Sequence, residues 1–358
     1  MPSHTPILLA VVAAIASWVV GFGVFHLLGF IGVIDHPNDR SSHLIPTVRG
    51  GGISIMAGMF IAAACVSRQF EDGPLLLISF AGLGLAVVSF IDDLRTVGVV
   101  QRLGCQLLAA VVAIYALRVS SIEVALSESS SVQVPFLLSV GVGVLWITGY
   151  TNAFNFMDGI NGLAGGQALV TSLGTAVLVG IQLQSLQAAP VLVSLCLAGA
   201  SLGFLQHNFP KADMFMGDVG SAPIGYLLAV LTLWSALIVG WWMLIPLALL
   251  HANFVLDSGI TFIRRVLHGD RWYEAHREHF YQRLLRSGRS HTFVTFLEIA
   301  LQVVVFGLMV IYLSATDFAR ILLILGTIGI WLAFFAYCEV CFRRSQPLRA
   351  NGGVRVES

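Results

Sequence analysis

The succession of long apolar runs separated by short polar breaks constrains this chain more than any other feature. A helix needs about 20 mostly apolar residues to cross a bilayer. Runs close to this length lie near residues 7–30, 51–67, 75–91, 103–118, 134–150, 162–181, 187–207, 220–237, 240–260, 293–314 and 319–341. We therefore predict an all-α, polytopic membrane protein with about 11 transmembrane helices, in a single membrane domain over residues 1–358.

Composition supports lipid rather than water as the solvent. Hydrophobic residues make up 57% and charged residues 11% of the chain, whereas a soluble protein has about 25% charged residues. The net charge is zero, and we expect no nucleic-acid partner. The first apolar run has no basic segment before it and is longer than a signal-peptide core, so we expect a retained helix.

Basic residues predict the orientation, because Lys and Arg are enriched in cytoplasmic loops. If the N-terminus is outside, sixteen of the nineteen fall on the inside, and only Arg68, Arg118 and Arg320 fall outside. This split predicts an outer N-terminus and a cytosolic C-terminus, which requires an odd number of crossings. The largest polar insert, about 264–291, is then a cytosolic basic loop.

The acidic motifs return to the same face. Asp92 and Asp93, then Asp158, then Asp218 are about sixty residues apart, which leaves room for two crossings each time. Adjacent carboxylates repel, which raises one pKa or attracts a cation. Asp92 and Asp93 can therefore hold Mg²⁺ or accept a proton, and the alternative is a solvated helix end. Arg102 supplies a cation across a short loop.

A dense polar array lies between two apolar runs. Asn152, Asn155, Asp158 and Asn161 recur every three residues, and glycines follow them. Glycine lets the backbone approach a ligand, and a helix beginning here would offer N–H groups to a phosphate. Mg²⁺ prefers oxygen ligands and keeps several waters, so one carboxylate and one amide suffice. A plain loop is the alternative.

Asp218, flanked by glycines in the run Met216 to Ser221, is a second candidate metal ligand, although an ordinary helix N-cap would look similar. In the basic loop, His276 and His279 are three apart. Neighbouring arginines oppose a metal there, so we expect hydrogen bonds to an anion alongside Arg277. A positive-inside anchor is the alternative for this loop.

Two further segments carry polar groups. Arg40 and His43, between the first two runs, could contact a lipid phosphate, or the segment is only a polar connection. His251, Asn253 and Asp257 lie toward the inner end of the ninth run. Polar groups in membrane helices usually face the bundle interior, so these could line the site.

Together these motifs resemble the polyprenyl-phosphate N-acetylhexosamine-1-phosphate transferase family, from about Asp35 to Leu285. The resemblance implies transfer of a sugar 1-phosphate from a UDP-sugar to undecaprenyl phosphate, releasing UMP, with Mg²⁺ (or Mn²⁺) as cofactor. It implies Asn155 and Asp218 as metal ligands, and Asp92 and Asp93 in catalysis. It also implies phosphate contacts for the basic residues Arg102, Arg277 and His279.

We further predict that Asp158 is catalytic and that Asn152, Asn161 and His276 bind substrate, with Arg40 and His43. In the simplest mechanism Asp92 orients or deprotonates the lipid phosphate, which attacks the β-phosphorus of the UDP-sugar. A covalent aspartyl intermediate is the alternative. The resemblance places the enzyme in the bacterial inner membrane with its site facing the cytosol. The sequence leaves a homodimer open.

Two departures from the family concern the sugar. The basic loop has His279-Phe280-Tyr281-Gln282-Arg283 where members that transfer N-acetylglucosamine commonly have two adjacent histidines. It is more similar to the subgroup that initiates lipopolysaccharide O-antigen with N-acetylated deoxy sugars. Arg102 replaces a lysine, which keeps the charge and changes the geometry. The alternatives are UDP-GlcNAc as donor for another envelope polymer, or a transporter, which predicts midplane carboxylates and inverted repeats.

Overall fold

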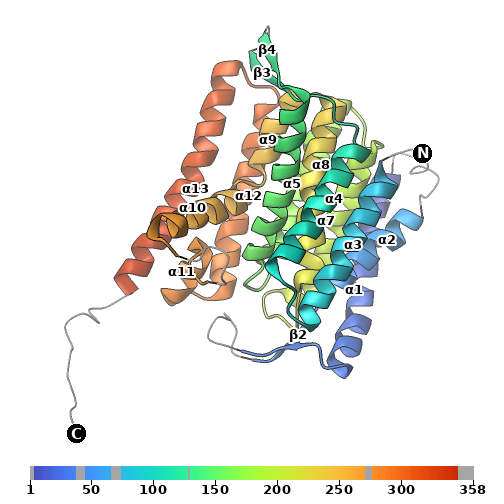
Figure 1. Ribbon diagram of the computed structural model, residues 1–358, viewed down its shortest axis with the longest axis vertical. Coiled ribbons are helices and arrows are strands. Elements are labelled where there is room, and N and C mark those ends of the chain that lie inside the picture. The colour runs from blue at the N-terminus through green and yellow to red at the C-terminus, as the bar shows by residue number, and fades with distance from the viewer. Residues whose placement is uncertain (1–3, 38–44, 66–73, 128–129, 271–275, 346–358) are drawn as a thin grey trace.

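Upright helices make up most of the structure, a computed structural model that describes residues 4–37, 45–65, 74–127, 130–270 and 276–345 (Figure 1). The helices are α1 (Thr5–Phe30), α2 (Gly52–Ala64), α3 (Leu75–Leu94), α4 (Val99–Ala116), α5 (Phe136–Met157), α6 (Leu163–Leu183), α7 (Ala189–Asn208), α8 (Asp218–Val239), α9 (Leu244–Leu249), α10 (Ala252–His268), α11 (Phe280–Arg286), α12 (His291–Tyr312) and α13 (Asp317–Ser345). The strands are β1 (Ile34–Asp35), β2 (Thr47–Arg49), β3 (Glu123–Ser127), β4 (Ser130–Gln133) and β5 (Met214–Phe215).

The all-α, polytopic membrane fold predicted from the sequence is confirmed. Within the described ranges, nine helices are long and apolar enough to cross a membrane, or ten if the bent pair of residues 241–249 and 252–268 counts as one span. Two of the predicted runs differ from a plain crossing. The run near 51–67 contains α2, which has only 13 residues, and the run near 240–260 bends by 74°.

The bend leaves α10 lying across the upright helices (Figure 1). At the break, the carbonyl of Leu250 accepts hydrogen bonds from Gln167 and Thr171 of α6, both at 3.1 Å, and from Gln302 of α12. A broken helix inside a membrane is stable only when its backbone groups find such partners. The polar side chains of α6 and α12 therefore explain why an apolar run interrupts its helix here.

The centre of the bundle is formed by α6, α7 and α8, whose apolar stretches are each 78% buried, against 22–39% for the other spans. Small residues bring the outer helix α1 close to α7. A Cβ added at Gly199 would lie 2.0 Å from the carbonyl oxygen of Ala10, and one at Gly203 would lie 2.2 Å from that of Ala14. Close backbone contact of this kind replaces the hydrophobic effect in membrane packing.

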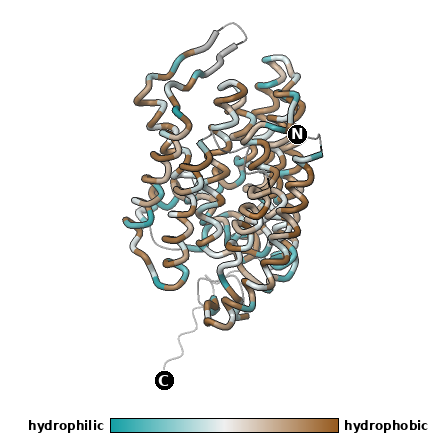
Figure 2. The backbone as a smooth tube through the Cα atoms, turned by 90° about the vertical axis from the view of Figure 1, so that its right-hand side faces the viewer, coloured by the Kyte–Doolittle hydropathy of each residue, from teal (hydrophilic) through white to brown (hydrophobic). Residues whose placement is uncertain are grey.

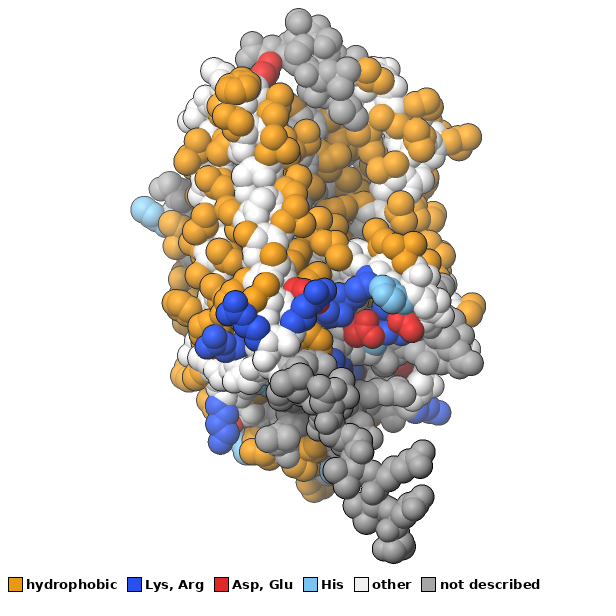
Figure 3. Space-filling view, turned by 90° about the vertical axis from the view of Figure 1, so that its left-hand side faces the viewer, with side chains coloured by type: hydrophobic (Ala, Val, Ile, Leu, Met, Phe, Trp, Pro, Cys, Tyr) orange, Lys and Arg blue, Asp and Glu red, His pale blue; other side chains and the backbone are white. Residues whose placement is uncertain are grey.

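Polar features collect at the two ends of the bundle. The antiparallel hairpin β3–β4 lies at one end, and the small sheet β1–β2–β5 lies at the other, where α13 ends (Figure 1). Figure 2 shows many of the hydrophilic segments toward the ends of the bundle, with mostly hydrophobic backbone between them. On the face drawn in Figure 3, most charged side chains form a band below a broad hydrophobic surface. The site described next lies at the sheet end.

Candidate active site

Strand β2 brings an arginine between two carboxylates at the sheet end of the bundle. Nε of Arg49 is 2.7 Å from Oδ1 of Asp93, and its Nη2 is 2.8 Å from Oδ1 of Asp218. The register explains this position, because Arg49 pairs with Phe215, three residues before Asp218. Burial lowers the pKa of the Arg49 guanidinium, but Asp218 and Asp93 outweigh burial and raise it above its ordinary value. Arg49 is therefore a permanent cation.

Glycines allow the backbones around this arginine to approach closely. Gly217 has a φ of +73°, and a Cβ on it would lie 2.9 Å from Oδ2 of Asp93 and 3.0 Å from the amide nitrogen of Gly50. A Cβ on Gly52, at the start of α2, would lie 2.1 Å from the Cα of Gly220 in α8. The glycines of the motif around Asp218 thus allow the first turns of α2 and α8 to pack in direct backbone contact.

Asp93 holds the start of α8. Its carboxylate accepts hydrogen bonds from the backbone N–H groups of Asp218 at 3.0 Å and Val219 at 2.9 Å, and its side chain is fully buried. A carboxylate at a helix N-terminus satisfies N–H groups that lack partners within the helix. Because both oxygens are engaged, the geometry supports a positioning role for Asp93, and its catalytic role stays a prediction.

Asp92, the other carboxylate of the pair, points to a different partner. Its Oδ2 is 2.8 Å from Nη1 of Arg102, and its Oδ1 accepts the N–H of Val97 at 2.7 Å. Nη1 of Arg102 also lies 3.7 Å from Oδ2 of Asp218. The predicted neighbours Asp92, Asp218 and Arg102 therefore do meet. Arg102 is 38% exposed, so a phosphate from solution can reach it.

Asn155 completes the cluster on the side of α5. Its Nδ2 donates to Oγ of Ser221 at 2.8 Å, and it also hydrogen-bonds Asp218. Among the described residues, no group of three or more His, Cys, Asp or Glu side chains is placed to hold a metal ion. Mg²⁺ at a diphosphate needs only one or two protein oxygens beside waters and phosphates. Asp218 and Asn155 are a donor set of that kind.

Asp158 follows the last residue of α5 and faces the same cluster. Burial, together with the negative charges of Asp218 and Asp93, raises the pKa of its carboxyl group to about 7, and Arg49 opposes the rise. A carboxyl group with a pKa near neutrality can bind and release protons under working conditions. The predicted catalytic role of Asp158 therefore has a suitable electrostatic setting.

The two other members of the asparagine array point elsewhere. Nδ2 of Asn152 donates to Oε1 of Gln106 at 2.6 Å, which ties α5 to α4. Asn161 lies beyond the end of α5, and its Nδ2 donates to the carbonyl oxygen of Pro210 at 3.2 Å. The three-residue spacing does not bring all four side chains to one surface, because α5 ends at Met157. Substrate binding by Asn152 and Asn161 stays a prediction.

The basic loop is fixed by an acid in α10. Oδ1 of Asp257 is 2.9 Å from Nδ1 of His279, and Oδ2 accepts the N–H groups of Phe280 at 2.9 Å and Tyr281 at 3.4 Å. Asp257 thus caps α11 and orients His279, whose ring packs 5.0 Å from that of His276. Tyr281 donates its hydroxyl to the carbonyl of Phe156 at 3.1 Å, which joins α11 to the end of α5.

The other residues of this loop have separate environments. The pKa of His276 falls to about 4, first because of burial and then because of His279 and Arg265, so His276 is neutral at pH 7. Oε1 of Glu278 accepts Nη1 of Arg265 at 2.9 Å. Arg277 is half-buried in the same turn. The predicted lipid-phosphate contacts Arg40 and His43 lie outside the described residues.

Sequence reasoning missed two roles. Arg49 was counted only as an orientation signal, although its place just before Gly50, Gly51 and Gly52 marks a tight turn. Asp257 was expected to line the site, and its action on His279 became visible only with α10 and α11 in place. The carboxylates and amides were predicted because they stand as an adjacent pair, as a dense and regular array, and between glycines, where apolar runs end.

Comparison with known proteins gives one family match. The family described as glycosyl transferase family 4 matches residues 75–236, a range that holds Asp92, Asp93, Asn155 and Asp218. The match covers α3 to α8 and so includes the carboxylate cluster, while the Asp257–His279 pair lies beyond it.

Curated relatives extend the similarity over most of the chain. The decaprenyl-phosphate N-acetylglucosaminephosphotransferase of Mycobacterium tuberculosis (strain ATCC 25618 / H37Rv) is 29% identical over 326 residues, covering 81% of this chain and 78% of the relative. The probable undecaprenyl-phosphate N-acetylglucosaminyl 1-phosphate transferase of Bacillus subtilis (strain 168) is 28% identical, covering 85% and 80%. A phospho-N-acetylmuramoyl-pentapeptide-transferase of Chlorobaculum parvum is 32% identical over 224 residues, covering 54% and 59%.

Proposed function

We propose that this chain, whose residues 75–236 match glycosyl transferase family 4, transfers an N-acetylated (deoxy)hexosamine 1-phosphate from a UDP-sugar to undecaprenyl phosphate and releases UMP. It is a membrane-embedded phospho-sugar transferase. The observation that carries the proposal is the cluster at the sheet end, where Asp92, Asp93 and Asp218 meet Arg49 and Arg102. Such a cluster suits phosphoryl transfer, in which positioning and charge neutralisation supply most of the catalysis.

The basic residues of the cluster would bind and orient the phosphates. Arg102 is paired with Asp92 and lies near Asp218, and a phosphate would compete for its donors. His279, oriented by Asp257, and Arg277 would hold the diphosphate of the sugar nucleotide from the other side. Arg49 would stay with Asp93 and Asp218, where its positive charge opposes the repulsion between the two carboxylates.

Two carboxylates are candidates to handle protons. Asp92 lies beside Arg102 and would orient the incoming lipid phosphate or take its proton. Asp158, with a pKa of about 7, is the better proton acceptor near neutrality, because a base works best when its pKa is close to the operating pH. We assign to Asp92 the role of orienting the lipid phosphate, and to Asp158 the role of accepting its proton.

Asp218 and Asn155 would hold Mg²⁺ at the diphosphate. When bound there, the cation would neutralise the charge that develops as UMP leaves. Carboxylate and amide oxygens are the donors that Mg²⁺ prefers, and their small number is usual where substrate phosphates complete the coordination. Mn²⁺ has the same preference for oxygen donors.

The proposal also specifies the donor sugar and the glycan that the product initiates. The basic-loop sequence around His279 supports an N-acetylated deoxy sugar and the start of an O-antigen chain. A second candidate donor is UDP-GlcNAc, for a different envelope polymer, because the names of two of the relatives specify N-acetylglucosamine. The bacterial relatives and the basic face together support an inner-membrane enzyme whose site opens to the cytosol.

A transferase assay tests the proposal directly. Purified protein in detergent would be incubated with undecaprenyl phosphate, Mg²⁺ and, one at a time, UDP-sugars that carry N-acetylglucosamine, N-acetylgalactosamine, N-acetylfucosamine or N-acetylquinovosamine. We expect UMP release with one of them, and loss of release on chelation with EDTA. Asp218→Asn should fold and lose turnover. If no donor gives UMP, the proposed function is wrong.

A further inference from the structure

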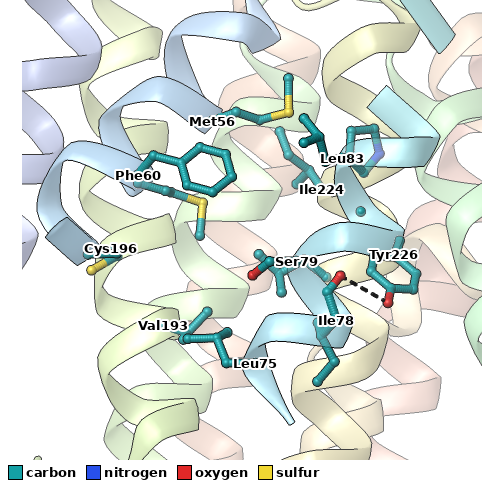
Figure 4. Close-up of a pocket in the computed structure, with 15 residues that line it drawn as sticks. Met56, Phe60, Leu75, Ile78, Ser79, Leu83, Val193, Cys196, Ile224 and Tyr226 are labelled. Carbon is teal, nitrogen blue, oxygen red and sulfur yellow. Dashed lines mark hydrogen bonds between the residues drawn. The ribbon is translucent and has the colours of Figure 1, made fainter. Parts of the chain in front are cut away.

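A buried polar network lies between α6, α10 and α12, apart from the carboxylate cluster. Elsewhere the interior of the bundle is apolar. The pocket between α2, α3, α7 and α8 (Figure 4), for example, has no charged side chain among the described residues that line it. The network instead contains the carboxyl group of Glu298, which is only 1% exposed. A carboxyl group inside a membrane bundle is costly, and such groups usually have a function.

The network begins at the break between α9 and α10. The carbonyl oxygen of Leu250 accepts hydrogen bonds from Nε2 of Gln167, at 3.1 Å, and from Nε2 of Gln302. Because the NH₂ group of Gln167 is used there, its Oε1 is left to accept Nδ2 of Asn253 at 2.9 Å. The side chain of Asn253 in turn hydrogen-bonds the carboxyl group of Glu298. The break thus orients the amide that contacts Glu298.

The surroundings of Glu298 favour a protonated carboxyl group. Its Oε1 is buried and has no hydrogen-bond partner among the described residues, so an ionised carboxylate there would lack donors that it needs. Asp257, which interacts with it, accepts His279 and two backbone N–H groups of α11. Of two neighbouring acids, the one with more donors holds the negative charge. The other titratable neighbours of Glu298 are Tyr281 and Cys338, and neither supplies a positive charge.

Helix α12 also contacts the other half of the site. Thr295 is three residues before Glu298 and lies on the same face of α12. Its Oγ1 donates to the carbonyl oxygen of Asn161 at 2.7 Å, in the loop that begins with Asp158. The polar face of α12 therefore connects the loop after α5 with the α10–α11 unit.

We propose that Glu298 is a positioning residue that, as a neutral acid, holds α10 through Asn253 and so places the Asp257–His279 pair at the UDP-sugar. Asn253 and Asp257 are four residues apart and neighbours on the helix, so a shift of one displaces the other. The inference rests on the proposed function and adds a residue that lies outside the family match at residues 75–236. Loss of the Glu298 contact should weaken binding of the nucleotide diphosphate.

Two substitutions of Glu298 test this role. Glu298→Gln keeps the size and the neutrality of a protonated acid, whereas Glu298→Leu removes the hydrogen bond at similar size. We expect the Kd for UDP, measured by calorimetry with Mg²⁺, to be unchanged in Glu298→Gln and about tenfold higher in Glu298→Leu. The KM for undecaprenyl phosphate should be unchanged in both. Thermal unfolding would confirm that each variant is folded.

Thr327→Val is the matched control, because it removes a buried hydroxyl group that bonds the carbonyl of Leu323 within α13. It should bind UDP like wild type. Unchanged binding in Glu298→Leu overturns the positioning role, and so does a rise in the KM for undecaprenyl phosphate as well, because that would be general damage. Equal losses in Glu298→Gln and Glu298→Leu would show that the ionised form is needed and would overturn the neutral acid.

A double variant tests whether Glu298 acts through Asp257. Substitutions that disturb one and the same contact are not additive. We therefore expect Asp257→Asn combined with Glu298→Leu to bind UDP about as weakly as the weaker of the two single variants. A loss of about 100-fold, the product of two independent tenfold effects, would contradict the proposed path.

Infrared spectroscopy tests the proton without the leucine variant. At pH 7 we expect wild type to show the carbonyl stretch of a protonated carboxyl group that Glu298→Gln lacks. Asp158→Asn would be recorded beside them, because the pKa of Asp158 is about 7 and its own band has to be assigned. A difference spectrum without a band for Glu298 overturns the neutral acid. Absent UMP release from wild type, with UDP binding as expected, would reject the proposed reaction and keep the positioning role.

Discussion

Arg49 illustrates how a single side chain can hold two acidic segments together. Its guanidinium group contacts Asp93 through Nε and Asp218 through Nη2. A lysine ammonium group cannot bridge two carboxylates with the same geometry. We expect Arg49→Lys to lower kcat about 100-fold, because displacement of the cluster by about 1 Å costs that much. The measurement is UMP release under saturating substrates.

Arg95→Lys serves as the matched control for that prediction, because Arg95 is an exposed arginine that directly follows α3. It should retain wild-type activity. Equal activity of Arg49→Lys and wild type would show that the bridge between α3 and α8 is dispensable.

Asp158 gives a prediction about pH. Its pKa is raised from the ordinary 3.8 to about 7, so the folded protein holds this proton more tightly than the unfolded chain. Stability from this group is therefore fully present below about pH 4 and is lost as pH rises to about 7. In the absence of Mg²⁺, we expect the Tm to fall across that window, and Mg²⁺ to offset the fall at pH 8.

The variant Asp158→Asn separates this group from the other acids. It cannot ionise, so its Tm should fall less than that of wild type between pH 5 and pH 8, by a few degrees, in a thermal scan in detergent. If the two proteins show the same pH profile, Asp158 is already ionised throughout the range and its assigned proton role is excluded.

At the scale of helices, the sequence predicts the apolar runs well because each run carries its own hydrophobic signal. It predicts the interruption at Leu250 and His251 poorly, because the donors that stabilise the break, Gln167 and Gln302, come from α6 and α12. The short helix α2 is obscured in the same way, since apolar residues continue past Ala64. Interactions between distant segments decide both features.

The α10–α11 unit carries its own prediction. Asp257 accepts the N–H of Phe280 at the start of α11 and also fixes the tautomer of His279. In Asp257→Asn the amide oxygen can still cap α11, but the amide NH₂ opposes Nδ1–H of His279 and favours the other tautomer. We expect the KM for the UDP-sugar to rise about tenfold or more, with the KM for undecaprenyl phosphate unchanged.

Asp257→Ala provides the contrast, because it loses both the cap and the histidine contact. It should be less stable than Asp257→Asn in a thermal scan, by about 1 kcal/mol for the lost cap. A purely structural Asp257 would predict that Asp257→Asn matches wild type in both stability and KM. A rise in both substrate KM values would indicate general damage to the site.

For the whole molecule, the sequence predicts which acidic residues lie at the end of the bundle that holds the site, but it does not predict the role of each. Spacing places Asp92, Asp93 and Asp218 on one face, yet Asp93 is used to hold α8 and Asp92 to pair with Arg102. That division depends on the direction in which α3 ends and on the strand pairing that delivers Arg49. Both are properties of packing between segments that lie more than a hundred residues apart.

The last prediction concerns the orientation of the bundle. The hairpin β3–β4 and strand β2 lie at opposite ends (Figure 1), and β2 carries Arg49 of the carboxylate cluster. The basic residues gather at the cluster end, which the positive-inside rule places in the cytosol. Gln133→Cys, at the end of β4 in the hairpin, and Lys211→Cys, at the cluster end, are both exposed reporters. They would be introduced after the five native cysteines are replaced by alanine. We expect an impermeant maleimide added to intact spheroplasts to label Gln133→Cys and to reach Lys211→Cys only after the membrane is disrupted. The reverse pattern would put the carboxylate cluster on the outer face, away from cytosolic UDP-sugars, and would contradict both the orientation and the proposed donor.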